Sequence, residues 1–315
     1  MSSENVKNNP DKLYDILVIG GGPAGLNAAL YASRKGFDVI VLSIMTGGQL
    51  NYTALIENYL GCNSIHGYEL ADRFRSHVQD YEIPIVETSN VTEYTREGKN
   101  HAITLSDGSV YKGKTMIVAT GSVYRNLNVP GEWEYAGKGV SYCAICDAPL
   151  YRNKDVIVVG GGNSAVEATI DLSKYAKSVT LLHRSKFRAD KVLLDTMESD
   201  PKITFHLRTV ITEVFGDEFM EGVKTINLDT KEEKIYKGQG LFIEIGHDPN
   251  TGPFKDVLNL SDSGAIITDG QMATNIPGVF AAGNVREFPY KQIIIAASDG
   301  AIAALSAADY LIQKY

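Results

Sequence analysis

The chain is short of several things that define common classes of protein. Its 315 residues include three cysteines and one tryptophan, and basic residues are outnumbered, giving a net charge of −8. Three cysteines are too few for the disulfide framework of a small secreted protein. The acidic balance argues against a nucleic-acid binder, which needs a basic face. No apolar run approaches the roughly 18 residues that would suggest a membrane span.

The first residues are also short of apolar side chains. Residues 1–12 (MSSENVKNNPDK) lack the apolar centre of a signal peptide, so we expect a flexible tail and a cytoplasmic protein. The chain as a whole is 44% hydrophobic and 22% charged, as in an ordinary globular protein, and its length predicts two domains. Its 30 glycines fall in clusters, which indicates loops where the backbone closely approaches another group.

The clearest clusters belong to two copies of a strand–turn–helix–strand pattern. In the first, residues 14–19 (YDILVI) precede three glycines, a helix-forming segment closed by Gly36, and residues 37–42 (FDVIVL). In the second, residues 155–159 (DVIVV) run into three glycines, NSAVEATIDLSKYA, and residues 178–182 (SVTLL). This order is typical of parallel α/β sheets. The copies lie too far apart for a solenoid repeat, and we predict two dinucleotide-binding units.

The remaining segments predict further strands and one long helix. Before the second copy, strands are expected at 91–94, 101–105 and 115–120. After it, antiparallel strands are expected at 203–205, 223–228 and 240–245. A helix is expected at 293–312, and crossings between the domains near 124–129 and 246–252, where Gly, Pro and Asn gather.

Each copy carries a glycine turn with the spacing G-x-G-x-x-G/A. The turns contain Gly20, Gly22 and Gly25 in the first copy, and Gly160, Gly162 and Ala165 in the second. The first position allows a tight turn, and the second lets backbone N–H groups approach a pyrophosphate. The third lets the helix pack closely against the strand, which alanine also permits. A turn that serves packing alone is the alternative.

The residues that follow the second copy indicate which nucleotide it binds. The strand ends in His183, Arg184, Ser185, Lys186, Phe187 and Arg188, with no carboxylate nearby. Arginine at this point matches a 2′-phosphate, whereas an acid would hold an unphosphorylated ribose. The turn therefore favours NADPH over NADH, with a solvated basic turn as the alternative. After the first copy the matching residue is Ser43, so no acid is expected to hold a ribose there.

Cys143 and Cys146 form a C-x-x-C motif just before the second copy. A zinc site needs four ligands, and Cys62 stands alone, so we expect no metal and an inert Cys62. Two unrelated buried thiols are an alternative. The spacing favours a dithiol–disulfide couple, whose thiolate a helix start would stabilise. Asp147 is positioned to deliver or take a proton, or else simply begins a helix.

Two nucleotide units and one dithiol together predict a cofactor. A nicotinamide gives two electrons as a hydride, and a flavin is the common intermediary between a nicotinamide and a disulfide. We therefore predict FAD in one unit and NAD(P)H in the other.

The chain closely resembles the low-molecular-weight thioredoxin reductases along essentially all residues after the tail. The matching strings are GGGPAG at 20–25, GGQL at 47–50, ENYLG at 57–61, ATG at 119–121, CAICD at 143–147, GGGNSAVE at 160–167, GHDPN at 246–250 and GVFAAGN at 278–284. The resemblance implies two Rossmann-like, three-layer ββα domains in an α/β fold, the second inserted into the first. Residues 13–126 and 251–315 would bind FAD, and residues 127–250 would bind NAD(P)H and carry the cysteines.

The resemblance also implies roles for particular residues. Cys146 would face the flavin, Cys143 would attack the disulfide of thioredoxin, and Asp147 would be the acid–base residue. FAD would be contacted by Gly20, Gly22, Gly25, Gln49, Asn58, Gly121, Gly283, Asn284, Gln292 and Ile293. NADPH would be contacted by Gly160, Gly162, Asn163, Ser164, His183, Arg184 and Arg188. A homodimer, and rotation of one domain about the two crossings, are implied as well.

Four positions depart from the family pattern. Asn284 replaces an aspartate that binds FAD in the family, and asparagine carries no charge. HRSKFRA is one residue shorter than the family's HRRxxFRA and has Ser185 in place of an arginine. Leu60 replaces a proline. Residues 290–295 (YKQIII) are more similar to the flavin subunit of alkyl hydroperoxide reductase.

These observations predict a thioredoxin reductase that passes electrons from NADPH through FAD and the Cys143–Cys146 disulfide to thioredoxin or a thioredoxin-like protein. Three alternatives remain at this point. The first keeps the chemistry but uses NADH or reduced ferredoxin as donor, or another redox protein as acceptor. The second is a dithiol oxidase that uses oxygen. The third is a non-catalytic flavin-binding sensor, which would not need both cysteines.

Overall fold

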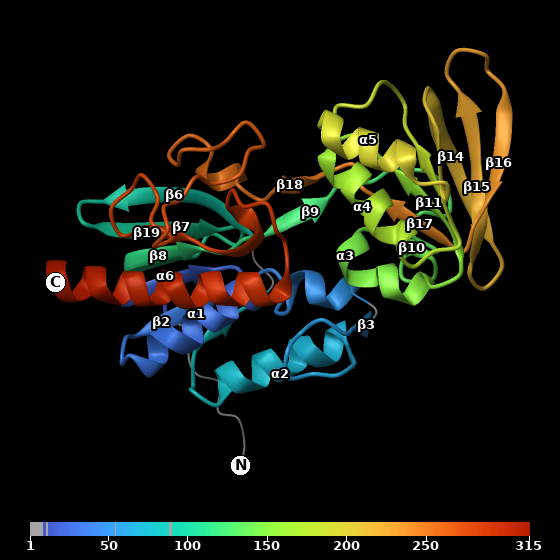
Figure 1. The fold of residues 1–315 in the computed structure, drawn as a ribbon. Helices are drawn as coiled ribbons and strands as arrows, with labels where there is room; N and C mark the ends of the chain where they lie inside the picture. Colours follow the sequence, from blue (N-terminus) through green and yellow to red (C-terminus); the bar gives the residue numbers. More distant parts are fainter. Residues whose placement is uncertain (1–8, 11, 54, 88–89) are drawn as a thin grey trace. The chain divides into compact units, whose positions relative to one another are not determined.

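The computed structural model describes residues 9–10, 12–53, 55–87 and 90–315, and Figure 1 shows its course. The first eight residues of the predicted tail lie outside the described residues. The chain forms two compact units. Unit 1 combines the described parts of Met1–Val123 with Asp248–Tyr315, and unit 2 is the continuous segment Tyr124–His247. Short strands β9 (Ser122–Tyr124) and β18 (His247–Pro249) lie where the chain passes from one unit to the other.

Unit 1 is built on a seven-stranded sheet with the order β5-β2-β1-β8-β7-β6, and β19 also pairs with β8. Its strands are β1 (Leu13–Ile19), β2 (Val39–Leu42), β5 (Ile85–Val86), β6 (Val91–Glu97), β7 (Asn100–Leu105), β8 (Val110–Val118) and β19 (Val279–Ala281). The pairs β1–β2, β1–β8, β2–β5 and β8–β19 are parallel, whereas β6–β7 and β7–β8 are antiparallel. The parallel part carries the first glycine turn.

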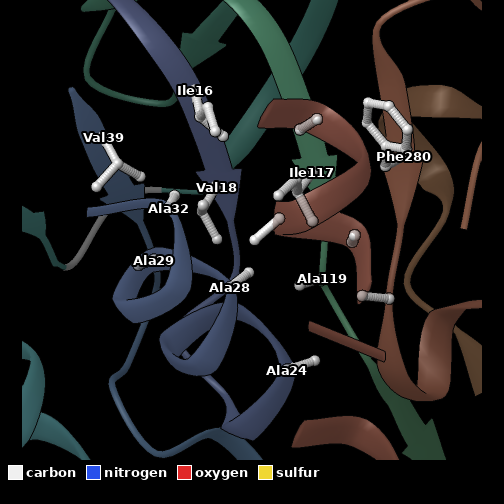
Figure 2. Packing of buried hydrophobic residues seen from close by; sticks show 14 of the residues in the cluster. Ile16, Val18, Ala24, Ala28, Ala29, Ala32, Val39, Ile117, Ala119 and Phe280 are labelled. Atoms are coloured by element: carbon white, nitrogen blue, oxygen red, sulfur yellow. The ribbon is translucent and has the colours of Figure 1, made fainter. Parts of the chain in front are cut away.

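Strand β1 feeds two apolar layers because alternate side chains point to opposite faces. Ile16 and Val18 pack under helices α1 (Pro23–Arg34) and α6 (Ile293–Lys314), as Figure 2 shows in part. Leu17 and Ile19 pack on the other face with residues of β7 and β8 and the segment after η3 (Gly252–Phe254). A smaller apolar cluster joins η1 (Gly48–Tyr52), β3 (Leu55–Ile56), β4 (Ile65–His66) and α2 (Gly67–Gln79).

Helix α6 is long and apolar enough to cross a membrane by length and composition, with a mean hydropathy of 1.3. Its packing in unit 1 accounts for that composition. A Cβ atom at Gly300 would overlap the carbonyl of Ala24, so the backbones of α6 and α1 are in direct contact. The buried residues of this helix are mostly alanines, which allow such a close approach.

Unit 2 is built on a five-stranded sheet with the order β10-β17-β11-β12-β13, and every pair is parallel. Its strands are β10 (Val140–Ser141), β11 (Asp155–Val159), β12 (Ser178–Leu182), β13 (Ile203–His206) and β17 (Gly240–Ile243). One face packs against α3 (Ala144–Asp147), η2 (Ala148–Tyr151), α4 (Asn163–Ser173) and α5 (Lys191–Ser199). The other packs against an antiparallel sheet of β14 (Thr209–Gly216), β15 (Met220–Asn227) and β16 (Glu233–Lys237).

The expected fold class is confirmed, and one expectation about strand direction is wrong. Of the three stretches expected to be antiparallel after the second copy, only 223–228 is, in β15. Residues 203–205 lie in β13, which follows helix α5 and so returns parallel to β12. Residues 240–245 contribute β17, which is an interior strand, fully buried and parallel to both neighbours. A buried parallel strand reads as a continuous apolar run, which resembles a short antiparallel strand in sequence.

Candidate functional site

The first glycine turn has the backbone geometry that the motif requires. Gly20 has φ +118°, and a Cβ atom there would overlap the carbonyl of Ala119. A Cβ at Gly25 would overlap the carbonyl of Gly20, so helix and strand are in contact. Gly22 instead faces open space and begins α1 without a side-chain cap. The N–H groups of the first helical turn are therefore left for a ligand, and the turn fits a dinucleotide phosphate.

Four of the other residues expected at FAD contact one another in two pairs. Gln49 Nε2 donates to the Ser122 carbonyl at 2.6 Å, and Gln49 Oε1 accepts from Asn284 Nδ2 at 3.1 Å. Asn58 Nδ2 donates to Gln292 Oε1 at 3.1 Å. The expected residues come from five parts of the chain. Gln49 lies in η1, Asn58 in the loop after β3, and Gly121, with φ +68°, in the segment after β8. Gly283 and Asn284 lie in η4 (Gly283–Val285), and Gln292 and Ile293 lie at the start of α6.

A buried ion pair that sequence reasoning missed supports the turn that carries Asn284. Arg286 and Asp299 are 7% and 4% exposed and form two hydrogen bonds, Nε to Oδ2 at 2.6 Å and Nη2 to Oδ1 at 2.8 Å. Asp299 Oδ2 also accepts from the Gly283 N–H at 3.1 Å. Lys291 Nζ donates to the carbonyl of Arg286 at 2.7 Å, and burial lowers the pKa of its ammonium. The only sequence signal was an aspartate within an apolar helix.

A second missed residue lies near the position where no ribose-binding acid was expected. Glu87 follows β5, and its Oε1 accepts from the Thr46 N–H at 2.9 Å, just beyond Ser43 at the end of β2. Arg75 also pairs with Glu87. Burial alone would raise the pKa of this carboxyl, but the bonds from Thr46 and Arg75 outweigh it and lower the pKa. A carboxylate, that of Glu87, therefore lies near the end of β2, and it comes from the residue that follows the adjacent strand β5.

The second glycine turn repeats the geometry of the first in unit 2. Gly160 has φ +154°, and a Cβ there would overlap the carbonyl of Glu244 and lie 2.5 Å from Ala165 Cβ. Gly162 faces open space and begins α4 without a side-chain cap. Asn163 and Asp190 form two hydrogen bonds of 2.9 Å. Asn163 Nδ2 donates to Asp190 Oδ2, and the Asp190 backbone N–H donates to Asn163 Oδ1. Ser164 is the next residue of the helix. The turn fits a second dinucleotide phosphate.

The basic segment after β12 folds over this turn. A Cβ at Gly161 would overlap the His183 ring, and the Arg188 N–H donates to the Gly161 carbonyl at 2.8 Å. His183 Nε2 lies 3.1 Å from the Ser185 hydroxyl and 3.2 Å from the Lys186 carbonyl. Burial lowers the pKa of His183, which favours the neutral imidazole. These contacts fix the backbone of residues 183–188, and they do not use the side chains of Arg184 and Arg188.

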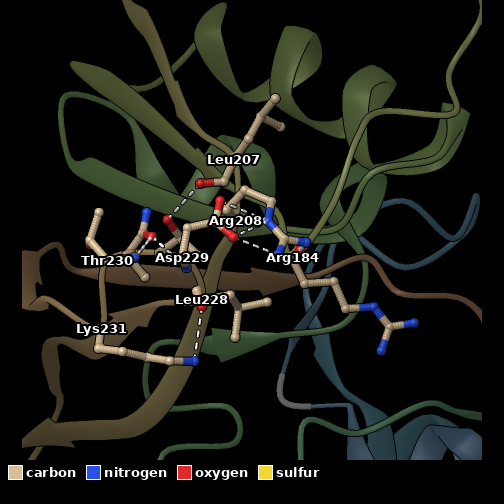
Figure 3. A network of polar contacts seen from close by, with 9 residues as sticks. Arg184, Leu207, Arg208, Leu228, Asp229, Thr230 and Lys231 are labelled. Carbon is tan, nitrogen blue, oxygen red and sulfur yellow. Dashed lines mark hydrogen bonds and ion pairs between the residues drawn. The ribbon is translucent and has the colours of Figure 1, made fainter.

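A second arginine, Arg208, contacts the backbone of Arg184, as Figure 3 shows. Arg208 forms hydrogen bonds of 2.7 to 3.0 Å to both carboxylate oxygens of Asp229 and contacts the Arg184 carbonyl at 3.5 Å. The Arg184 guanidinium points away from this group in Figure 3. A guanidinium in that position can receive an anionic ligand.

Cys143 and Cys146 form a disulfide with their Cα atoms 5.3 Å apart. Cys143 caps helix α3, since its sulfur accepts from the Cys146 N–H at 3.2 Å. Asp147 Oδ2 accepts from the Ser141 hydroxyl at 2.6 Å, and the same hydroxyl accepts from the Cys143 N–H at 3.1 Å. Burial raises the pKa of Asp147, although the Ser141 bond opposes it. The expected redox pair and acid–base residue therefore share one hydrogen-bonded cluster.

The third cysteine and the acidic and histidine side chains bear on the expectations of an inert Cys62 and of no metal site. Cys62 is a free, half-buried thiol in unit 1 with the Arg73 guanidinium 4.0 Å from its sulfur. Among residues 9–315, apart from the four undescribed positions, no group of three or more His, Cys, Asp or Glu side chains could hold a metal ion.

Sequence reasoning also missed Glu244, a carboxyl beside the disulfide. Glu244 follows β17, and its Oε1 accepts from the Ala144 N–H at 3.1 Å. Burial raises the pKa of Glu244 to about 7, against the lowering effect of that N–H bond. Nothing in the local sequence GLFIEIG signals this contact, because the two partners are 100 residues apart.

Two dinucleotide-binding folds and a disulfide at a helix start define a nucleotide-dependent disulfide oxidoreductase. The family described as pyridine nucleotide-disulphide oxidoreductase matches residues 14–300, and the chain belongs to this family. The expected resemblance is confirmed.

Solved thioredoxin reductases match almost the whole chain. The enzyme from Streptococcus pyogenes MGAS5005 is 40% identical with a TM-score of 0.91, and the match covers 96% of this chain and 99% of that one. The thioredoxin reductase from Giardia duodenalis is 31% identical with a TM-score of 0.91, covering 96% and 100%.

Curated relatives carry a different name. The F subunit of alkyl hydroperoxide reductase in Staphylococcus aureus (strain N315) is 41% identical over 302 residues, 96% of this chain. The protein of the same name in Pseudomonas putida is 43% identical over 311 residues, 98% of this chain. In both cases the chain spans only 60% of the length of the relative.

Proposed function

We propose that this protein is a thioredoxin reductase that uses NADPH and FAD to reduce thioredoxin or a thioredoxin-like protein. The observation that carries the proposal is the Cys143–Cys146 disulfide at the start of a helix, in the unit that holds the second glycine turn. Similarity to thioredoxin reductases over nearly the whole chain supports it. Unit 1 would hold FAD and unit 2 NADPH, in a cytoplasmic homodimer.

When bound, FAD would supply the relay between a hydride donor and a disulfide. The protein's own groups do the sulfur chemistry. The Cys143–Cys146 disulfide takes up two electrons and two protons to give two thiols, and Asp147 is proposed to handle a proton at Cys146. The Cys143 thiolate then attacks one sulfur of the acceptor disulfide, releasing an acceptor thiolate and forming a mixed disulfide. Cys146 attacks Cys143, restores the original disulfide and releases the second acceptor sulfur as a thiolate, which takes up a proton.

A second candidate differs only in the acceptor. The curated relatives named as F subunits of alkyl hydroperoxide reductase, together with the YKQIII segment, favour a protein linked to peroxide reduction as the acceptor. The half-reaction at the disulfide would be the same in both cases. The two candidates therefore separate by acceptor, not by the chemistry of Cys143 and Cys146.

The donor is proposed from the residues around the second turn. Arg184 directs its guanidinium away from the Arg208–Asp229 pair, and Arg188 lies where its backbone binds the glycine turn. Both can reach an anionic substituent on the adenosine ribose, and no carboxylate forms an interaction with His183, Arg184 or Arg188 among the described residues. NADPH is therefore the proposed donor.

The decisive experiment is an anaerobic titration of the flavin-loaded protein with NADPH and, separately, NADH, followed by addition of thioredoxin or of a peroxiredoxin-linked acceptor. We expect flavin bleaching by NADPH and recovery of colour only when thioredoxin is added. Bleaching by NADH alone would overturn the donor, and recovery with the peroxiredoxin-linked acceptor alone would favour the second candidate.

Serine variants test the role of the disulfide. Cys143→Ser and Cys146→Ser should each keep the flavin spectrum and abolish acceptor reduction. Cys62→Ser is the matched control and should retain full activity, since Cys62 lies in unit 1 outside the pair. Full acceptor reduction in either of the first two variants would rule out the proposed route.

A further inference from the structure

Glu244 occupies a defined place in the parallel sheet of unit 2. Strand β17 lies between β10 and β11, with Ser141 paired to Phe242 and Val159 paired to Ile243. The next residues beyond these strands include Cys143 after β10, Glu244 after β17 and Gly160 after β11. Carboxyl ends of adjacent parallel strands form the edge at which ligands bind in such sheets. Glu244 therefore lies between the redox pair and the nucleotide turn.

Glu244 contacts both neighbours with different parts of the residue. Its backbone carbonyl packs so closely on Gly160 that no Cβ atom would fit there. Its side-chain Oε1 accepts the Ala144 N–H at 3.1 Å, and Ala144 directly follows Cys143 and begins α3. The carboxyl is thus held at the same end of the helix as the disulfide.

The groups that face Glu244 do not neutralise its charge. Asp147 and Tyr124 face the same cluster, and the pKa of Tyr124 is raised to about 12 by burial and by the negative charges of Glu244 and Asp147. Within the described residues, no basic side chain shifts the pKa of Glu244, which burial raises to about 7.

A carboxyl in this position acts on thiols by charge. Opening the disulfide gives two thiols, and reactivity requires one of them to lose its proton. A carboxylate nearby disfavours the thiolate, whereas a protonated carboxyl does not. We propose that Glu244 is a positioning residue whose side-chain charge sets the pH range over which the reduced Cys143–Cys146 pair forms its reactive thiolate. The inference deepens the proposed function and rests on it.

Glu244→Gln is the matched substitution, because glutamine keeps an oxygen for the Ala144 N–H and loses only the charge. The full-length flavin-loaded protein is reduced with dithiothreitol, which opens the disulfide independently of any nicotinamide. The rate of iodoacetamide alkylation of Cys143 and Cys146 is then followed by mass spectrometry from pH 5 to 9. We expect the two rate profiles to agree near pH 5, where the wild-type carboxyl is protonated. Above pH 7, where it is ionised, the midpoint should be about one pH unit lower in Glu244→Gln, which corresponds to an up to roughly tenfold higher thiolate fraction. Glu213→Gln, on β14, is the control and should match the wild type.

Each result decides the matter. A Glu244→Gln rate profile that coincides with that of the wild type overturns the proposal. This holds even if the profile of Glu244→Ala differs from the wild type, because that difference would show that the hydrogen bond to Ala144, and not the charge, affects the thiols. If Glu244→Gln does not fold, the wild-type profile decides: coupled titration of a carboxyl and a thiol predicts a transition broader than one group gives, and a single sharp titration overturns the proposal. Failure of NADPH to open the wild-type disulfide, when dithiothreitol does so, contradicts the proposed function and leaves the thiol measurement intact.

Discussion

The two glycine turns have the same backbone and different surroundings. In each, the first glycine has a positive φ and packs on a neighbouring strand end, and the glycine two residues on faces open space. In each, the residue that ends the second strand packs on the middle glycine, Ser43 on Gly21 and His183 on Gly161. Beyond that residue, unit 1 presents a carboxylate from β5 and unit 2 presents two arginines. The backbone of each turn therefore fits a pyrophosphate, and under the proposed function the residues at the strand ends would distinguish the two nucleotides.

Substitutions at the open glycines should give the largest separation between the two turns. Gly22 and Gly162 have ordinary φ angles of −79° and −98° and room for a Cβ atom, which would point to where a phosphate is expected. We expect Gly22→Ala to lose FAD by at least about tenfold in affinity, and Gly162→Ala to keep FAD and lose NADPH to a similar degree. Isothermal titration of the apoprotein and of the flavoprotein checks this.

The control for these variants is thermal unfolding of the apoprotein, which should shift little in either one. If Gly22→Ala kept the flavin and weakened NADPH binding, while Gly162→Ala released the flavin, the assignment of one nucleotide to each unit would be reversed.

Acid should weaken unit 1 through a buried histidine. His101 is fully buried, its Nδ1 contacts the Tyr94 hydroxyl at 3.0 Å, and burial lowers its pKa from 6.5 to about 4. The unfolded chain therefore binds a proton below pH 6.5 that the folded chain refuses until about pH 4, so stability is lost across this window as the pH falls. We expect about 2 kcal/mol less stability at pH 5 than at pH 7 from this group. Urea unfolding at both pH values measures it.

His101→Phe removes the titrating group and serves as the comparison for that measurement. The variant should be less stable at pH 7, because Tyr94 loses its partner, yet show a flatter dependence on pH between 7 and 5. An unchanged slope would mean that other groups cause the acid sensitivity of unit 1.

The basic segment of unit 2 predicts a selective effect on one donor. Arg184→Ala should raise the KM for NADPH about tenfold, equivalent to about 1.4 kcal/mol, and leave the KM for NADH unchanged, because only the phosphorylated ribose needs the guanidinium. Steady-state kinetics with each donor tests this. Arg96→Ala, in an exposed strand of unit 1, is the control for loss of one positive charge. Equal losses for both donors would assign Arg184 a structural role.

The smallest effect is expected behind that segment. The Arg208–Asp229 pair is largely exposed, at 46% and 58% of the side-chain surface, so solvent screens it and Asp229→Asn should change stability little. Its measurable consequence should be a modest rise in the KM for NADPH as the support of Arg184 loosens. A larger effect than that of Arg184→Ala would place Arg208, not Arg184, at the ligand.

Local sequence patterns predicted where helices and strands lie better than they predicted how strands pair and which distant side chains meet. The strands at 155–159 and 178–182 were located residue for residue because apolar runs end at glycine or at charged residues. The parallel direction of β17 was missed because it depends on distant neighbours. Glu87 and Glu244 were missed for the same reason: each is an isolated acid after a short strand, and only the sheet order brings it to Thr46 or Ala144. Asn58 and Gln292, 234 residues apart, were expected at one site only through the resemblance.

The discontinuity of unit 1 has a consequence for synthesis on the ribosome. Helix α6 follows the other helices described here, and it lies directly on α1, with Gly300 against Ala24. Unit 2 is continuous in sequence and has its own sheet and cores, so it has all its parts once residue 247 has emerged. Until α6 has been made, the face of β1 that carries Ile16 and Val18 is covered by α1 but not by α6. Emergence of residues 293–314 should therefore be the event that completes unit 1, and nascent chains halted before residue 293 should need a chaperone for unit 1 alone.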